Sequence, residues 1–197
     1  MTDLLIIFVK NPVLGKVKTR LARDIGPEKA LDIYKKLLIK THDQTCQGAY
    51  DKWLFYADKM ASDDLWDDRY KKKAQLQSPD LGQRMADAFA QGFEQGYTNI
   101  CIIGSDCYEL TSEIIDDAFT HLGKHDFVIG PANDGGYYLL GMNHLENRLF
   151  LNKEWSTEEV YPKTIQDLQS LQANYFLLPE LVDIDNINDL NRFPELF

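Results

Sequence analysis

Four cations follow the first apolar run of this sequence, and together they could bind a small polyanion. They are Lys10, Lys16, Lys18 and Arg20. Residues 1–25 hold five Lys and Arg against two Asp, a net +3, although the whole chain carries −10 at pH 7. A positive pocket in a repelling field concentrates a small anion such as the phosphates of a nucleotide. A solvated loop is the alternative explanation of the same residues.

Carboxylates at two later places could act with these cations through a divalent metal ion. Asp106 follows the buried run 100–103, and Asp183 and Asp185 lie near the end of the sequence. Mg²⁺ is usually held by one or two carboxylates plus the phosphates of the substrate, and without a metal the acids would repel the ligand. A helix N-cap is the ordinary alternative for Asp106. Either Asp183 or Asp185 could supply the second carboxylate.

A glycine pair lies in a further polar segment. Asp134, Gly135, Gly136 and Tyr137 follow another apolar run. These residue types favour a tight turn whatever their function. Paired glycines also let the backbone approach a ligand closely, so the segment is a candidate for substrate contact.

Composition bounds the class of protein and of partner. A chain of 197 residues that is 44% hydrophobic can bury one substantial core, so we expect a single domain over 1–197. Its net charge argues against nucleic acid and against membrane surfaces as partners, because duplex binding needs a long cationic face. We find no secretory leader and no run of about 20 apolar residues, and therefore expect a cytoplasmic protein.

Several other kinds of site are absent from the sequence. The three cysteines form no disulfide framework, and the four histidines have no metal-ligand spacing. There is no nucleoside-triphosphate loop of the Walker type, no dinucleotide-binding glycine fingerprint and no nucleophile elbow.

Short apolar runs alternate with amphipathic segments, which is typical of a layered α/β domain. The continuous apolarity of 100–103 indicates a strand that is buried on both faces of a parallel sheet. We expect strands at 4–9, 53–57, 74–77, 99–104, 127–130, 137–141 and 175–178. We expect helices from Gly26-Pro27, over part of 62–73, over 84–93, after Thr111 and over 187–193. Ligands of open α/β sheets bind at the carboxyl ends of the strands, where the cations and carboxylates above would meet.

These motifs, in this order, resemble those of glycosyltransferase-like proteins of the nucleotide-diphospho-sugar transferase (GT-A) superfamily, which are similar to the guanylyltransferases of cofactor biosynthesis. The matching segments are 8–12, 15–21, 80–85, 104–107, 130–138, 155–157 and 183–185. The resemblance covers nearly the whole chain and implies a three-layer α/β/α domain with a mostly parallel mixed sheet. Tyr108, Pro79 and Asn186 stand where such proteins commonly have Pro, Gly and Thr.

The resemblance also implies roles by position. Nucleotide phosphates would lie against Lys10, Lys16, Lys18 and Arg20. A metal ion, Mg²⁺ or Mn²⁺, would lie against Asp106 and against Asp183 or Asp185. The sugar or the acceptor would lie against Asp134, Gly135, Gly136 and Tyr137. Catalysis would rest on Asp106, Lys16 and Arg20, because the two cations neutralise charge that builds on the leaving phosphate.

Two reactions fit this assembly. In glycosyl transfer a nucleoside diphosphate leaves the anomeric carbon of a sugar, whereas in nucleotidyl transfer an acceptor phosphate attacks the α-phosphorus and pyrophosphate leaves. The same cations and metal ion could stabilise the leaving phosphate group in both reactions. We favour glycosyl transfer from a nucleotide sugar to a small-molecule acceptor, because the multiple-glycine loop of sugar nucleotidyltransferases is absent. Nucleotidyl transfer from a nucleoside triphosphate is the alternative, and a nucleotide-binding module without catalysis is an alternative of another class.

Overall fold

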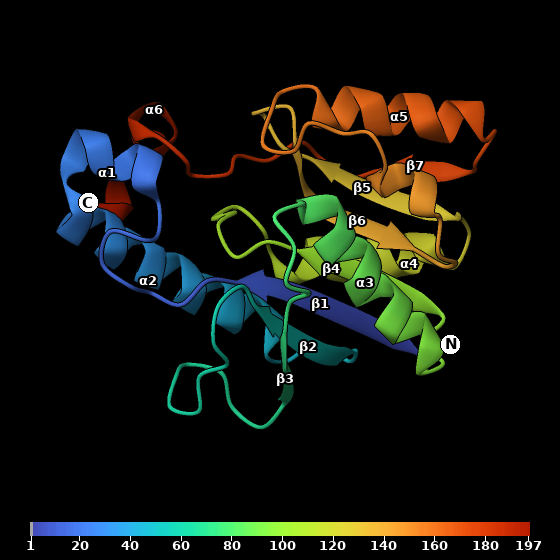
Figure 1. Ribbon diagram of the computed structural model, residues 1–197, viewed down its shortest axis with the longest axis horizontal. Coiled ribbons are helices and arrows are strands. Elements are labelled where there is room, and N and C mark those ends of the chain that lie inside the picture. Colours follow the sequence, from blue (N-terminus) through green and yellow to red (C-terminus); the bar gives the residue numbers. More distant parts are fainter. Residues whose placement is uncertain (1) are drawn as a thin grey trace.

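The computed structural model describes residues 2–197, and in this part of the chain seven strands form one sheet (Figure 1). Their order across the sheet is β3-β2-β1-β4-β6-β5-β7. The strands are β1 (Asp3–Val9), β2 (Asp51–Tyr56), β3 (Tyr70–Ala74), β4 (Asn99–Ile103), β5 (Phe127–Pro131), β6 (Tyr137–Met142) and β7 (Tyr175–Leu177). Strand β6 runs antiparallel to β4 and β5, and the other pairings are parallel. The predicted mostly parallel mixed sheet is confirmed.

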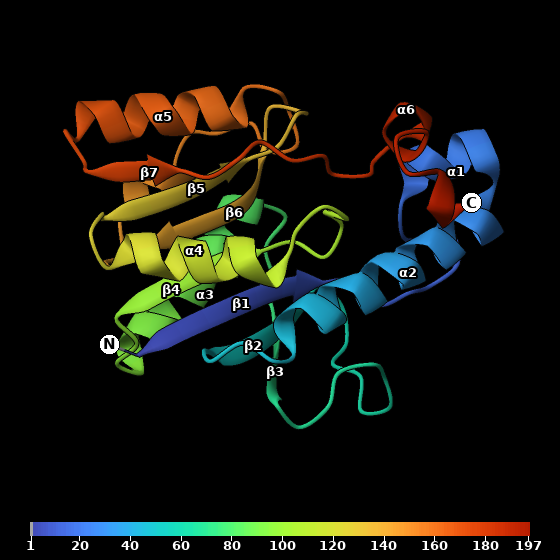
Figure 2. The ribbon, with the colours of Figure 1, turned by 180° about the vertical axis from the view of Figure 1, so that it is seen from behind.

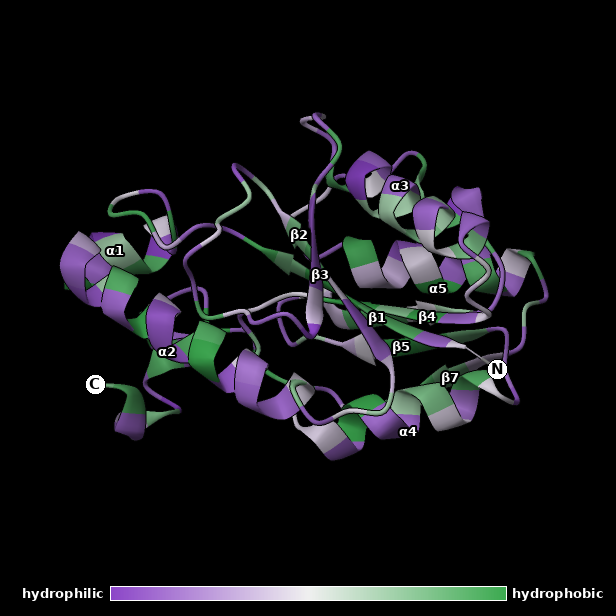
Figure 3. Ribbon diagram, turned by 90° about the horizontal axis from the view of Figure 1, so that it is seen from below, coloured by the Kyte–Doolittle hydropathy of each residue, from purple (hydrophilic) through white to green (hydrophobic). Residues whose placement is uncertain are grey.

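Helices cover both faces of the sheet, so the α/β/α layering is confirmed as well (Figure 3). The helices are α1 (Thr19–Ile25), α2 (Pro27–Thr45), α3 (Leu81–Glu94), α4 (Ser112–Leu122), α5 (Val160–Ser170) and α6 (Ile187–Leu190), with 3-10 turns at Asn147–Phe150 and Pro194–Leu196. Helices α3 and α5 lie on one face and α2 and α4 on the other. None of the helices within 2–197 is long and apolar enough to cross a membrane.

Alternation along β1 builds the two apolar layers. Leu5 and Ile7 face the layer of α2 and α4, whereas Leu4 and Ile6 face the layer of α3 and α5. All four side chains are fully buried. Their burial on both faces explains why this strand has a continuous apolar sequence, as parallel strands at the centre of a sheet do.

The first half of α2 extends past the edge of the sheet, where α1 and the end of the chain cover it (Figure 2). Leu21 of α1 and Ile33 of α2 share an apolar cluster with Ile184, Leu190 and Phe193. This packing holds the segment 183–185 beside the loop between β1 and α1, which is 160 or more residues away in sequence.

The region before and within β3 differs from the sequence prediction. We predicted a helix within 62–73 and a strand over 74–77, but the structure has bends and turns over 62–69 and the strand over 70–74. Three consecutive lysines, 71–73, resemble a surface helix in sequence, yet lysines are common on edge strands because their stems pack while their charges stay wet. Lys73 packs even more closely, since its Nζ lies 3.6 Å from the ring centroid of Trp53 and donates to Gln91 Oε1 at 2.7 Å.

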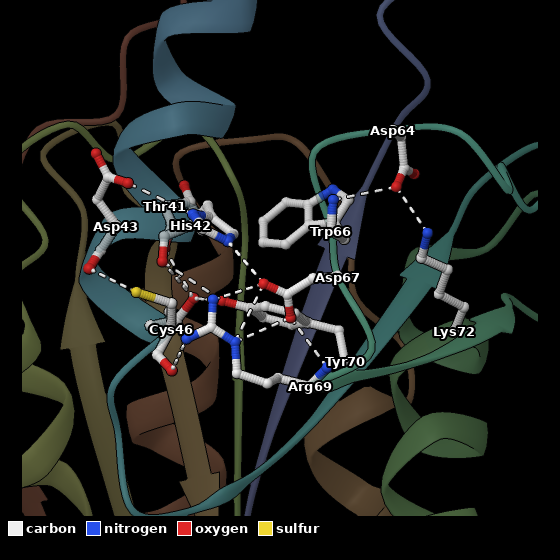
Figure 4. Close-up of polar contacts among 11 residues, drawn as sticks. Thr41, His42, Asp43, Cys46, Asp64, Trp66, Asp67, Arg69, Tyr70 and Lys72 are labelled. Atoms are coloured by element: carbon white, nitrogen blue, oxygen red, sulfur yellow. Dashed lines mark hydrogen bonds and ion pairs between the residues drawn. The ribbon is translucent and has the colours of Figure 1, made fainter.

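A polar cluster, which we call the α2–β3 cluster, fixes the crossing segment before β3 against the end of α2 (Figure 4). The hydroxyl oxygens of Thr45 and Tyr70 are 2.8 Å apart, and both residues are buried. Arg69 donates from Nε to Asp67 Oδ1 at 2.9 Å and from Nη1 to the Cys46 carbonyl at 3.2 Å. These bonds tie the helix to the edge strand.

Candidate functional site

A cleft of about 470 Å³ opens at the carboxyl ends of β1, β3 and β4. Its walls include the segments 8–10, 17–20, 102–106 and 155–157, together with residues of the glycine turn after β5 and of the stretch before α6. The volume is within the range of pockets that bind small molecules and cofactors.

Lys18 lies at the centre of charge in this cleft. Its Nζ donates to Asp106 Oδ2 and to Asp185 Oδ1, each at 2.9 Å, and its side chain is only 5% exposed. Burial alone would lower the pKa of Lys18, but the charges of Asp106 and Asp185 raise the pKa above its ordinary value. The structure thus brings together one residue from the cationic loop and two of the predicted carboxylates.

The backbone of Lys18 is left-handed, with φ 46° and ψ 46°. This conformation costs about 1 kcal/mol for a residue other than glycine. Lys18 is also the N-cap of α1 and makes no side-chain capping bond there. The Lys18 side chain therefore forms the two ion pairs with Asp106 and Asp185 and makes no capping bond to α1.

Asp106 is not a helix cap, which removes the ordinary alternative for this residue. The N-cap of α4 is Thr111, whose hydroxyl accepts a hydrogen bond from the Ile114 amide at 3.4 Å. The backbone carbonyl of Asp106 accepts from the Ile184 amide at 3.3 Å. The chain thus joins the end of β4 to the segment 183–185 through the backbone, and the carboxylate of Asp106 stays in the cleft.

Asp185 is held in place by the turn that begins α6. Asn186 caps this helix, since its side chain accepts hydrogen bonds from the amides of Asn188 and Asp189. The Asp189 side chain in turn accepts hydrogen bonds from the amides of Asp185 and Asn186. Asparagine therefore serves as a cap at a position where the resembling proteins have threonine. Arg20 Nη1 is 3.5 Å from Asp185 Oδ2, and the Arg20 side chain is 60% exposed. Burial would raise the pKa of Asp185, but the neighbouring Lys18 lowers it.

Asp183 is the third carboxylate of the cleft and lies deeper. Its Oδ1 is buried and has no hydrogen-bond partner among the residues described. Burial and the charge of Asp106 raise its pKa well above the ordinary value. A buried carboxylate oxygen without a partner is costly unless the group takes up a proton, or a cation or a donor from a ligand reaches it.

The donor chemistry of these carboxylates fits a hard divalent cation, because Mg²⁺ prefers oxygen ligands. The unpartnered Oδ1 of Asp183 supports that fit. No cluster of three or more His, Cys, Asp or Glu within 2–197 is arranged to hold a metal ion in this structure. The ammonium of Lys18 already occupies the space between Asp106 and Asp185.

The other predicted cations are more exposed. Lys10 lines the cleft, and its backbone is tied to Tyr34, whose hydroxyl donates to the Lys10 carbonyl at 3.0 Å. Tyr34 also lies 3.3 Å from the Ser105 hydroxyl and so joins the ends of β1 and β4. Lys16 stands on an exposed turn and is not among the cleft-lining residues that the structure describes.

The conformation of the turn at 134–136, which we call the glycine turn, partly explains why it contains two glycines. Asp134 Oδ1 accepts from the Gly136 amide at 2.8 Å. Gly135 has φ +84°, and a Cβ there would lie 2.3 Å from the Glu158 carbonyl oxygen. Asp134, Gly136 and Tyr137 line the cleft, whereas Gly135 faces the segment before α5.

Arg84, Gln75 and Trp155 also line the cleft, although the sequence analysis gave them no role. Gln75 is buried, and its Oε1 accepts from Arg84 Nη1 at 2.9 Å. Arg84 Nε and Trp155 Nε1 are buried donors without partners in the described chain. Arg84 and Trp155 lie in motifs of the resemblance, so a signal existed for them, but none existed for Gln75.

Comparisons with known proteins agree with the resemblance seen in the sequence. A family model described as "Uncharacterized protein conserved in bacteria (DUF2064)" matches residues 41–157. A crystal structure from Desulfovibrio desulfuricans G20, described as a "putative nucleotide-diphospho-sugar transferase", is 32% identical, with a TM-score of 0.89 over 97% of this chain and 86% of the other. No curated protein matched the chain.

More distant structures share the fold alone. Rv0371C of Mycobacterium tuberculosis H37Rv, in complex with manganese, is 12% identical with a TM-score of 0.60 and covers 99% of both chains. The 4-diphosphocytidyl-2C-methyl-D-erythritolsynthase of Anaerococcus prevotii DSM 20548 is 11% identical with a TM-score of 0.59, over 97% of this chain and 93% of the other.

Proposed function

This chain belongs to the DUF2064 family, and from that premise we propose that it is a metal-dependent transferase that takes a nucleotide sugar as its donor. One observation carries the proposal: Lys18 meets Asp106 and Asp185 at the carboxyl edge of the sheet, in a cleft of small-molecule size. Cations and carboxylates in one cleft fit a diphosphate that a divalent ion bridges to the acids.

Asp106 would hold the metal ion together with Asp183 or Asp185, and the bound ion would supply positive charge to the diphosphate. The unpartnered oxygen of Asp183 supports this assignment. So does the manganese complex of a protein with the same fold. Mg²⁺ and Mn²⁺ both suit carboxylate ligands.

The cations of the loop would bind the phosphates directly. Arg20 and Lys10 line the cleft, and Arg20 is exposed, so its guanidinium can reach a phosphate with little loss of hydration. A guanidinium binds two phosphate oxygens at once. Lys16, on its exposed turn, would join them only where the ligand extends beyond the cleft wall. Positive charge at these positions would stabilise the nucleoside diphosphate as it leaves the sugar.

Other residues of the cleft lining would hold the sugar or the acceptor. Asp134, Tyr137 and Trp155 belong to that lining, and the indole N–H of Trp155, which has no partner among the described residues, suits a hydroxyl or carbonyl oxygen of a ligand. In the proposed reaction the bond between the anomeric carbon and the diphosphate oxygen breaks, and a bond to the acceptor oxygen forms. The acceptor hydroxyl gives up its proton, which passes to the departing nucleoside diphosphate or to solvent water.

Nucleotidyl transfer is the second candidate, because a diphosphocytidyl synthase shares the fold. In that reaction the same cations would stabilise departing pyrophosphate. The products separate the two reactions, since glycosyl transfer releases a nucleoside diphosphate and nucleotidyl transfer releases pyrophosphate.

The test is turnover of purified protein with Mn²⁺ and a panel of nucleotide sugars and nucleoside triphosphates, each with and without phosphorylated acceptors. Release of nucleoside diphosphate from a nucleotide sugar supports the proposal, and Asp106→Asn serves as the inactive control. Pyrophosphate release alone would replace it with nucleotidyl transfer. Binding without either product would leave a nucleotide-binding module.

A further inference from the structure

The ammonium of Lys18 occupies the position between two carboxylates where a bridging cation would bind. It is 2.9 Å from an oxygen of Asp106 and 2.9 Å from an oxygen of Asp185, and the side chain is almost completely buried. Exposed Arg20 is the second positive charge at Asp185, at 3.5 Å. The carboxylates of Asp106 and Asp185 are therefore already paired with two cations, Lys18 and Arg20.

We infer that Lys18 and a divalent metal ion compete for Asp106 and Asp185, so that this chain takes up its metal together with a phosphorylated ligand rather than as a free ion. The inference rests on the proposed function, because it names the form in which the substrate enters the same site.

Electrostatics gives the first reason. A divalent ion that binds Asp106 and Asp185 while Lys18 stays in place would face a buried ammonium at close range, and like charges at such distances in a protein interior repel strongly. The ammonium must therefore move before both carboxylates can bind the metal.

The fate of the displaced ammonium gives the second reason. A buried ammonium that leaves its carboxylates without a new partner carries a heavy desolvation cost. Within the cleft, a phosphate group of a ligand is a partner of the required charge. Free metal brings no such anion, whereas a metal bound to a diphosphate brings both the cation for the acids and the anion for Lys18.

The local backbone favours such an exchange. Lys18 has φ 46° and makes no side-chain bond to its own helix, so the two ion pairs are what the side chain contributes in this position. Removal of the ammonium therefore leaves the capping of α1 unchanged. At this φ a glycine is free of the strain that lysine carries.

The experiment measures the affinity of the protein for Mn²⁺ alone, from the electron paramagnetic resonance signal of free Mn²⁺. The variants are Lys18→Met and Lys18→Gly, both without the ammonium, and the glycine variant protects the test if the longer apolar side chain disturbs folding. We expect both to bind Mn²⁺ about tenfold or more tightly than the unmodified protein, because two neighbouring carboxylates that have lost their shared counter-ion repel each other and gain most from a new cation.

Two control variants separate competition from net charge. Lys29→Met removes the same charge from the exposed surface of α2, outside the cleft lining, and we expect its Mn²⁺ affinity to change less than about twofold, since exposed charges are screened. Lys18→Arg keeps the charge and should gain nothing. Unchanged or weaker Mn²⁺ binding in both Lys18→Met and Lys18→Gly would overturn the inference.

A second titration shows the consequence for the ligand. Inorganic pyrophosphate is titrated into protein with saturating Mn²⁺, and we expect Lys18→Met to bind it more weakly than the unmodified protein does. Equal or tighter pyrophosphate binding in the variant would contradict the exchange. The metal-only titration stands even if no nucleotide is turned over, so failure of the proposed function and failure of this inference give different results.

Discussion

Two dense polar clusters of this molecule contain the same kinds of residue but differ in burial and in surroundings. In the cleft, Lys18 links Asp106 to Asp185, and its side chain is 5% exposed. In the α2–β3 cluster, Arg69 binds Asp67, and the Arg69 side chain is 46% exposed (Figure 4). Only the first cluster borders the 470 Å³ cleft.

Burial of the cation and access to the cleft distinguish a candidate ligand site from a cluster that only stabilises the fold. A buried cation with two carboxylates, on a left-handed backbone and beside an open cleft, holds charge where a ligand can reach it. The α2–β3 cluster joins a helix end to an edge strand through exposed ion pairs and a buried hydroxyl pair. We expect substitutions in the cleft to change ligand binding, and substitutions of the buried hydroxyl pair in the α2–β3 cluster to change stability.

The largest effect is expected at Asp106. Asp106→Ala should weaken metal-dependent binding of a nucleoside diphosphate by about 100-fold or more, since it removes a proposed metal ligand and the partner of the buried Lys18 ammonium. The domain should remain folded, because Thr111 and not Asp106 caps α4. Calorimetric titration and thermal unfolding measure the two properties. A variant that unfolds while its metal affinity persists would show that Asp106 is a structural residue, and the proposed difference between the cleft and the α2–β3 cluster would be wrong.

Arg20→Ala should have the next largest effect. We expect nucleoside diphosphate binding to weaken by about tenfold and binding of the corresponding nucleoside to change little, because in the proposed site the guanidinium would contact the phosphates and not the nucleoside. Parallel titrations of the two ligands measure this. Equal losses for both would remove the phosphate role.

In the α2–β3 cluster, Tyr70→Phe should cost about 1 kcal/mol of unfolding free energy at neutral pH, because it leaves the buried Thr45 hydroxyl without this partner. Nucleotide binding should not change. Chemical unfolding monitored by fluorescence gives the free energy, and loss of nucleotide affinity in this variant would contradict the separation of the two clusters.

The same variant should alter stability at alkaline pH. Burial raises the pKa of Tyr70 from 10 to about 12, so the folded state keeps the neutral phenol while the unfolded chain ionises. The contribution of Tyr70 is therefore complete below pH 10 and is lost as the pH rises to about 12. Tyr70→Phe should lose less stability over this interval than the unmodified protein does, and parallel curves would refute the shift.

The smallest effect is expected for Arg69→Ala. Its ion pair with Asp67 is exposed, and such pairs contribute little in water. The thermal midpoint should stay within experimental scatter, and nucleotide affinity should not change. A large fall in midpoint would show that the exposed part of the cluster matters as much as the buried hydroxyl pair.

The sequence predicts the sheet well where burial is strong. The continuous apolar runs of β1 and β4 mark buried parallel strands, and from that follows which loops share one edge. The sequence prediction misplaces β3, since it assigns the three lysines to a helix and begins the strand at 74 rather than 70. It misses α1 and α5, which lack a strong apolar periodicity. Burial in the finished fold, rather than local preference, decides these elements.

The candidate site shows the same limit. The order of the motifs, and the rule that ligands bind at the carboxyl ends of the strands of an open α/β sheet, indicate that the cationic loop and the carboxylates lie at the same edge of the sheet. Lys16 and Lys18 nevertheless look alike in sequence. In the structure Lys18, whose backbone is left-handed, places its ammonium between Asp106 and Asp185, whereas Lys16 lies on an exposed turn. Gln75 lines the cleft because it follows β3, a strand that the sequence analysis placed at 74–77 and the structure places at 70–74.

The most direct test of the account is the binding of nucleoside diphosphates to the unmodified protein with Mn²⁺ and again with a chelator. If the cations and carboxylates of the cleft act together on one diphosphate, calorimetry should show binding with Mn²⁺ and a loss of at least about tenfold when the metal is removed. Binding of equal strength in the chelator, or none in either condition, would contradict it.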